Sequence, residues 1–211
     1  MQEELQGVAA TNISDQILDE KKYKIQYIAL GPEKYDFNEL NQLLPILESP
    51  VYRIHTLMLI NNNNVGVGDD IIESIIVAMN QGNTVVTLRL SICGIRLCAW
   101  ARYLPFLNNL TSLDLSYNCM DDSEFAKLCK GLETCYCLKH LNIAHNRFGG
   151  IKSCVIEQML SSNRALVSLS LCGNRCDDSV WSALYRGLAA NNVLLQLDLT
   201  ESYITLPNAL I

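Results

Sequence analysis

The sequence LTSLDLSYN at residues 110–118 returns as LKHLNIAHN at 138–146 and as LVSLSLCGN at 166–174, with a step of 28 residues each time. In each copy, apolar residues stand at the first, fourth and sixth places, and asparagine stands at the ninth. Alternation of apolar and polar residues over so short a segment predicts a β-strand with one face buried. The constant step indicates that each copy is one unit of a stacked repeat.

The pattern continues on both sides of this stretch. Further copies begin at Ile54, Val85 and Leu194, and a degenerate copy precedes them, so that successive steps are about 29, 31, 25, 28, 28 and 28 residues. The ninth place requires a small side chain that reaches the backbone of the turn from inside. We expect a structural ladder at this place, formed by Asn62, Cys93, Asn118, Asn146, Asn174 and Ser202.

A helical segment follows each predicted strand. Phe125, Leu128 and Leu132 are spaced for one face of a helix, and the same spacing returns from Trp181 to Leu188. A short strand followed by a helix, repeated at a constant step, places parallel strands on one side and helices on the other. We therefore predict an α/β fold, a right-handed horseshoe-shaped solenoid with strands on the concave face and helices on the convex face.

The pattern also divides the chain. Residues 1–22 are polar and acidic, and we interpret them as an N-terminal flank or arm. Residues 23–211 form the repeat domain, with the degenerate first repeat at about 23–50, regular repeats at about 51–204 and a short tail at 205–211. A solenoid needs a polar cap over its last repeat, and this tail is apolar. Either it folds back as a lid, or the open end meets another chain or a continuation of this one. Contact with another chain includes end-to-end self-association.

These residues resemble the ribonuclease-inhibitor-like class of leucine-rich repeat proteins, whose consensus is Leu-x-x-Leu-x-Leu-x-x-Asn/Cys-x-Leu followed by a helix. The matching segments are Leu110 to Met120, Leu138 to Phe148 and Leu166 to Cys176, and the resemblance covers about residues 51–204. It implies the curved solenoid fold and a surface that binds proteins. It implies no shared chemistry, because members of the class have unrelated activities.

Composition and charge exclude several functions. The net charge of −6 opposes general binding to nucleic acid or to anionic membranes. No uncharged apolar run reaches about 18 residues, and the start of the chain lacks the features of a secretory signal. We predict a soluble protein in the cytoplasm, with cytoskeletal, ciliary and nuclear locations as alternatives. The nine cysteines are odd in number and scattered, which favours reduced thiols over a disulfide framework.

Few motifs here could support catalysis or bind a metal. The pairs Asp69-Asp70, Asp121-Asp122 and Asp177-Asp178 each precede a predicted helix, where a carboxylate accepts free backbone N–H groups. The cysteines and the three histidines lack the spacing of a zinc finger, and no nucleophile, phosphate or dinucleotide motif accompanies them. We predict no catalytic residue, no cofactor and no metal site, with a reactive thiol at Cys172 as the minority interpretation.

The outward side chains of the predicted strands form the remaining candidate site. They are apolar or basic in the early repeats and become polar or acidic towards Asp198. As partner-binding residues we predict Arg89, Asp114, Tyr117, His140, Asn142, His145 and Asp198. The predicted function is a non-catalytic protein-interaction module or scaffold. The alternatives are a regulator of a small GTPase, similar to the Ran-activating leucine-rich repeat family, and a redox or metal sensor built on the cysteines.

Overall fold

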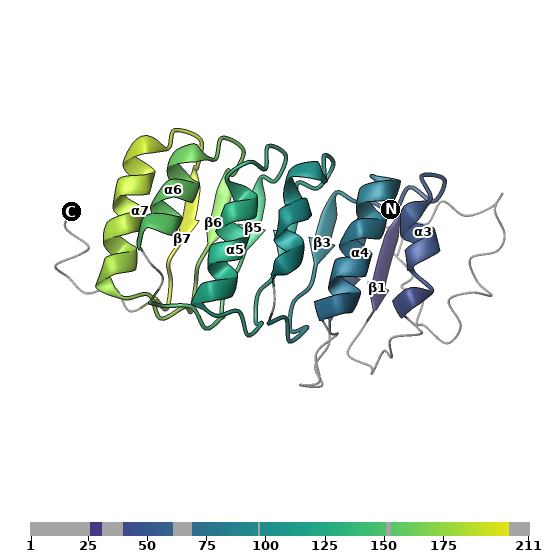
Figure 1. The fold of residues 1–211 in the computed structure, drawn as a ribbon, viewed down its shortest axis with the longest axis horizontal. Coiled ribbons are helices and arrows are strands. Elements are labelled where there is room, and N and C mark those ends of the chain that lie inside the picture. The colour runs from purple at the N-terminus through teal and green to yellow at the C-terminus, as the bar shows by residue number, and fades with distance from the viewer. Residues whose placement is uncertain (1–25, 31–39, 61–68, 97, 151–152, 203–211) are drawn as a thin grey trace, which may run out of the picture.

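The computed structural model describes residues 26–30, 40–60, 69–96, 98–150 and 153–202 of the 211-residue chain. The predicted N-terminal flank, the tail at 205–211 and the ladder residue Asn62 lie outside these described residues. Strand and helix alternate along the chain from β1 at Tyr27–Leu30 to β7 at Gln196–Asp198 (Figure 1).

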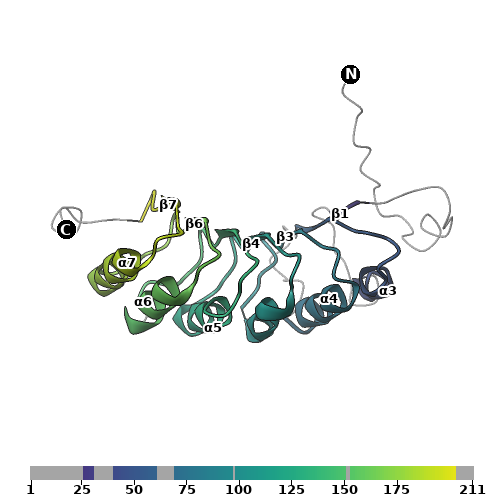
Figure 2. The same ribbon diagram turned by 90° about the horizontal axis from the view of Figure 1, so that it is seen from above.

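A single curved sheet forms one layer of the molecule. Its seven strands stand in sequence order and are all parallel. Between the first and last strands lie β2 at Thr56–Leu59, β3 at Thr87–Arg89, β4 at Ser112–Asp114, β5 at His140–Asn142 and β6 at Ser168–Ser170. Seen from above, the strands line the inner side of the arc (Figure 2). The predicted α/β solenoid is confirmed.

The second layer covers the outer side of the arc (Figure 2), and among the described residues it has one helix after each strand from β1 to β6. The α-helices are α3 at Leu44–Glu48, α4 at Asp69–Gly82, α5 at Asp122–Leu132, α6 at Ser153–Ser162 and α7 at Asp178–Ala190. Between α4 and α5 stands a 3₁₀-helix, η1, at Ala99–Phe106, which contains Pro105. Because proline has no backbone N–H and clashes with the preceding turn, this repeat has a shorter helix and the shortest step.

The core lies between the two layers and is continuous from repeat to repeat. At the centre of each inner strand, a leucine faces the helices and is almost fully buried, as Leu113, Leu141 and Leu169 show. Phe125 of α5 is fully buried and stacks on Phe148, with ring centroids 4.2 Å apart and an angle of 7° between planes. Each repeat therefore packs its apolar residues against those of the next.

Asparagine side chains form hydrogen bonds that connect successive loops after the strands. Asn118 Nδ2 donates to the carbonyl oxygen of Leu90 in the preceding repeat at 2.8 Å and to that of Leu115 at 2.9 Å. Its Oδ1 accepts from the Ile95 backbone N–H at 3.0 Å. Asn146 and Asn174 repeat this arrangement, while Cys93 and Ser202 donate to carbonyl oxygens of the preceding repeat. The five described ladder residues thus satisfy backbone groups that the loops would otherwise bury without partners.

A second ladder, which we did not predict, lies in the loops that precede the strands. Asn163 Nδ2 donates to the Leu132 carbonyl oxygen at 2.7 Å, and Asn191 Nδ2 donates to the Leu160 carbonyl oxygen at the same distance. Cys135 occupies the equivalent position one repeat earlier, and its thiol donates to a carbonyl oxygen of the preceding repeat. Cysteine therefore replaces asparagine in both ladders.

Helix capping explains two of the three aspartate pairs. Asp121 accepts the Glu124 N–H, and Asp177 accepts the N–H groups of Ser179 and Val180, so both are N-caps as predicted. Hydrogen bonds from the Ser179 hydroxyl and from backbone N–H groups lower the pKa of Asp177. Asp69, the first residue of α4, accepts the Arg96 N–H of the next repeat at 3.2 Å. These carboxylates thus satisfy the backbone and need no metal to explain them.

Glycine allows the helices to approach closely. A Cβ built on Gly131 of α5 would lie 2.2 Å from the Ala101 carbonyl oxygen of η1. We expect Gly131→Ala to lower the free energy of unfolding by about 1–3 kcal/mol, because the overpacking exceeds the gain in helix propensity. Urea unfolding followed by circular dichroism measures this change, with the exposed Lys130→Ala as control. A more stable Gly131→Ala variant would contradict the close approach.

Candidate functional site on the concave strand face

The outward side chains of the strands form continuous rows across the concave face. Strand pairing brings Arg89 beside Asp114, Asp114 beside Asn142, and Asn142 beside Ser170, which pairs with Asp198. Four of the predicted partner-binding residues thus share the central row. His140 lies in the neighbouring row between Ser112 and Ser168. Parallel strands stand about 4.8 Å apart, so seven strands give a face roughly 29 Å long.

Polar groups of the central row are held by their own loops. Oδ1 of Asp114 accepts the Ser116 N–H at 2.9 Å, Oδ1 of Asn142 accepts the Ala144 N–H at 3.1 Å, and Asp198 accepts the Thr200 N–H at 3.0 Å. The same bond in three repeats fixes the direction of each side chain. Among the described residues, the second oxygen of Asp114 and Nδ2 of Asn142 make no hydrogen bond to another side chain. These groups are available to a partner.

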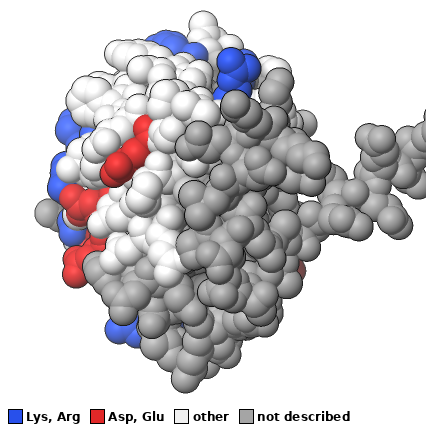
Figure 3. Space-filling model, turned by 90° about the vertical axis from the view of Figure 1, so that its right-hand side faces the viewer, with Lys and Arg blue, Asp and Glu red and all other residues white. Residues whose placement is uncertain are grey.

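Charge changes sign along this row. Arg89 is exposed in the third strand, whereas Asp198 is exposed in the seventh. The Thr200 N–H and hydroxyl, together with the Ser170 hydroxyl at 3.0 Å, lower the pKa of Asp198 and keep it ionised. Around the N-terminal end of the solenoid, acidic and basic side chains interleave along one side (Figure 3). The described residues in this view therefore present no surface of a single charge.

Tyr117 and His145 lie in the loops that follow the strands. Their rings stack with centroids 4.3 Å apart and an interplanar angle of 16°. Both residues adopt a left-handed backbone, as do Ile92, Gly173 and Glu201 at the equivalent places. A Cβ on Gly173 would lie 2.3 Å from Nδ1 of His145, so glycine makes room for the imidazole. The ring is held between Tyr117 and the Gly173 backbone.

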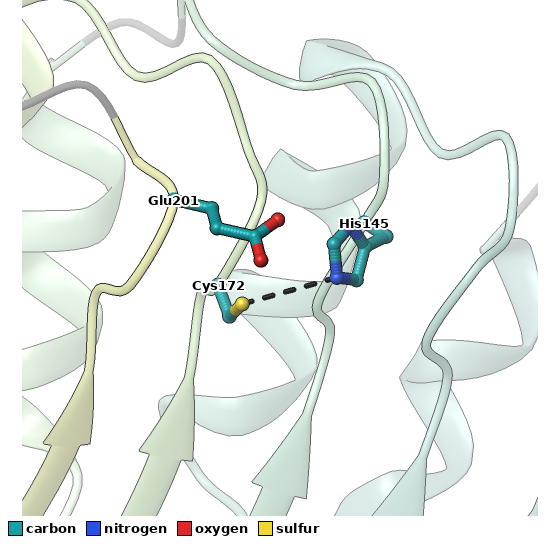
Figure 4. A group of neighbouring side chains, drawn as sticks. All are labelled: His145, Cys172 and Glu201. Carbon is teal, nitrogen blue, oxygen red and sulfur yellow. Dashed lines mark hydrogen bonds between the residues drawn. The ribbon is translucent and has the colours of Figure 1, made fainter.

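Two further residues, which we did not include in the predicted site, lie beside His145. Figure 4 shows the side chains of His145, Cys172 and Glu201 converging from three neighbouring loops. Cys172 Sγ is 3.9 Å from Nε2 of His145, and the donor atoms of all three residues lie within 4.8 Å of one another. The prediction of no metal site excluded a cysteine site because the cysteines lack a second pair or a histidine at zinc-finger spacing. Stacking of repeats instead brings together residues 27 and 29 positions apart.

Most of the other thiols are held in the core. All nine cysteines are free. Burial raises the pKa of Cys98 to about 12 and that of Cys176 to about 11, and it also raises the pKa of Cys129. Cys176 is buried at the position that Met120 and Phe148 occupy in earlier repeats. These buried thiols are protonated near neutral pH, which makes them poor nucleophiles and metal ligands.

Comparisons with known proteins agree with this architecture. The family model described as Leucine Rich Repeat matches residues 137–159. No curated protein matches the chain in sequence. Among the described residues, helices are too short or too polar to cross a membrane.

Two solved structures are similar in fold. An internalin from Listeria monocytogenes has a TM-score of 0.50 and 18% identity, and the match covers 82% of this chain and 47% of the internalin. The structure titled leiomodin-1 actin-binding site 2 has a TM-score of 0.49 and 18% identity, with 74% of this chain and 92% of that one covered. Membership of the ribonuclease-inhibitor-like class stays a prediction. The repeated pattern, the parallel solenoid and the family match at residues 137–159 show that the chain has the leucine-rich repeat fold.

Proposed function

We propose that this chain is a non-catalytic interaction module that binds a protein partner on its concave strand face. The observation that carries the proposal is the central row, in which Arg89, Asp114, Asn142 and Asp198 stand side by side on paired strands. Rigid strands hold these groups in place. The binding site therefore loses little conformational freedom when a partner binds. The alternation of cation, carboxylate and amide suits a partner with a mixed polar surface.

The flanking loops extend this surface. Tyr117 is 56% exposed, and its ring is already ordered by the stack on His145. Exposed aromatic residues with few freely rotating bonds are favoured in interfaces because they give a large contact area at low entropic cost. We therefore include Tyr117, His140 and His145 in the proposed contact surface. The cytoplasmic location stays a prediction, as do the partner and any self-association.

Affinity capture from the source cell, followed by mass spectrometry, tests this proposal. Asp114→Arg combined with Asn142→Arg places two cations at the centre of the face, and we expect the partner captured by the wild type to be lost. The control is Cys154→Arg combined with Ser182→Arg, which places the same number of arginines at exposed positions of α6 and α7. Circular dichroism verifies that both variants are folded.

The partners captured by the wild type, the strand variant and the control distinguish the candidate functions. Loss of one partner in the strand variant alone supports the concave face as the binding surface. Retention of all partners by that variant contradicts the proposal. Capture of a small GTPase in only one nucleotide state would favour the regulator over a scaffold.

A further inference from the structure

We propose that His145, Cys172 and Glu201 form a binding site for a divalent transition metal, with Zn²⁺ as the expected ion, at the loop edge of the concave face. Each residue supplies one donor atom, and the three atoms lie within 4.8 Å of one another. They come from the loops after β5, β6 and β7 and point toward a common space (Figure 4). This site does not depend on the proposed protein partner.

The distances are close to those of a zinc centre. Bond lengths of about 2.3 Å to sulfur and 2.0 Å to nitrogen in a tetrahedral site place the two ligand atoms about 3.5 Å apart. Cys172 Sγ and His145 Nε2 are 3.9 Å apart. The ring and the thiol thus need to move by only a few tenths of an ångström. Glu201 is exposed and has several rotatable bonds, so its carboxylate can close the remaining gap.

Surrounding groups already orient two of the ligands. The His145 imidazole is fixed by its stack on Tyr117 and by the Gly173 backbone, with Nε2 directed toward Cys172. The Thr200 hydroxyl lies 2.8 Å from Oδ1 of Asp198 and 3.1 Å from Cys172 Sγ, so its single hydrogen can turn from the carboxylate to the thiolate when a metal binds. Neighbouring groups of this kind raise metal affinity because they hold the ligands in the binding geometry.

The donor set selects the class of metal. A thiolate and an imidazole are unsuited to Mg²⁺ and Ca²⁺, which prefer oxygen ligands. One nitrogen, one sulfur and one oxygen suit Zn²⁺ and leave the fourth tetrahedral position for water or for a side chain of a partner. Binding converts the Cys172 thiol into a metal thiolate and releases its proton to solvent. No electrons are transferred in this step.

The ladder gives the site a rigid frame. Inside the same three loops, the side chains of Asn146, Asn174 and Ser202 donate to the backbone carbonyl oxygens of Ile143, Leu171 and Thr200, while the proposed ligands lie on the outside. A bound ion would join these three loops on the opposite side. Metal binding is therefore expected to raise the resistance of the last repeats to unfolding as well as to give a direct spectroscopic signal.

Titration of the purified, reduced full chain with Co²⁺ tests the site directly. We expect binding of one equivalent, with a thiolate-to-cobalt charge-transfer band in the near ultraviolet, and displacement of the cobalt by Zn²⁺. Cys172→Ser should abolish the band, and His145→Asn should weaken binding at least tenfold. Asparagine tolerates the left-handed backbone at residue 145. The matched controls Cys154→Ser and His140→Ala should bind like the wild type.

Each outcome decides for or against the site. Absence of stoichiometric binding, unchanged binding by Cys172→Ser, or loss of binding in Cys154→Ser overturns the proposal. Glu201→Gln provides a variant at an exposed position, which tests the site even if Cys172→Ser does not fold. A reduced affinity of Glu201→Gln for Co²⁺ supports the site, and an unchanged affinity removes Glu201 from it and overturns the three-ligand proposal.

Discussion

Replacement of Phe148 by alanine is expected to lower the free energy of unfolding by about 3–5 kcal/mol, the range for deletion of a fully buried aromatic ring. Phe148 has no exposed surface and stacks on Phe125 with ring centroids 4.2 Å apart. It comes from the loop after β5, whereas Phe125 belongs to the helix of the preceding repeat. The substitution therefore removes contacts between two repeats and leaves a cavity at their junction.

Phe106→Ala is the matched control for this prediction. Phe106 is 59% exposed at the end of η1, so its loss should change the free energy of unfolding by less than about 1 kcal/mol. Urea unfolding followed by far-ultraviolet circular dichroism compares the two variants under the same conditions. Equal destabilisation by both substitutions would show that the Phe125–Phe148 stack does not contribute to the junction.

The position of Phe148 illustrates what the sequence could predict. A step of 28 residues aligns Met120, Phe148 and Cys176, and all three are buried as the inward position requires. The rows of the concave face followed in the same way, because alternation along a strand determines which side chains point outward. Periodicity therefore predicted the sheet, the helices, the core and the placement of Arg89, Asp114, Asn142 and Asp198.

Contacts between repeats at unequal positions were harder to predict. Tyr117 and His145 occupy the same place in successive repeats, but their stacking depends on the missing side chain at Gly173. Cys172 and Glu201 occupy different places in their repeats, so no aligned column contains both. The second ladder was missed because Cys135 interrupts the column that Asn163 and Asn191 form. These features depend on side-chain size and direction, which the period alone does not specify.

Asn146→Ala is expected to be the second large perturbation, with a loss of about 2–4 kcal/mol in the free energy of unfolding. Asn146 is buried, and its Nδ2 donates to the carbonyl oxygens of Leu115 at 3.0 Å and of Ile143 at 3.1 Å. Its Oδ1 accepts the Met120 N–H at 3.1 Å. Alanine would leave these backbone groups without partners in the interior, and an unsatisfied buried polar group costs about 1–3 kcal/mol.

Asn146→Cys distinguishes lost hydrogen bonds from lost volume. Cysteine already stands at this place as Cys93, whose thiol donates to the Leu59 carbonyl oxygen at 3.2 Å. We expect the cysteine variant to retain one such bond and to lie between the wild type and Asn146→Ala in stability. Asn192→Ala, at an exposed position after α7, should be nearly neutral. If Asn146→Ala were no more destabilising than Asn192→Ala, the ladder would not contribute to the stability of the stacked repeats. A stability that falls from Asn146 to the cysteine variant and then to the alanine variant would show that hydrogen-bonded backbone groups hold successive loops together.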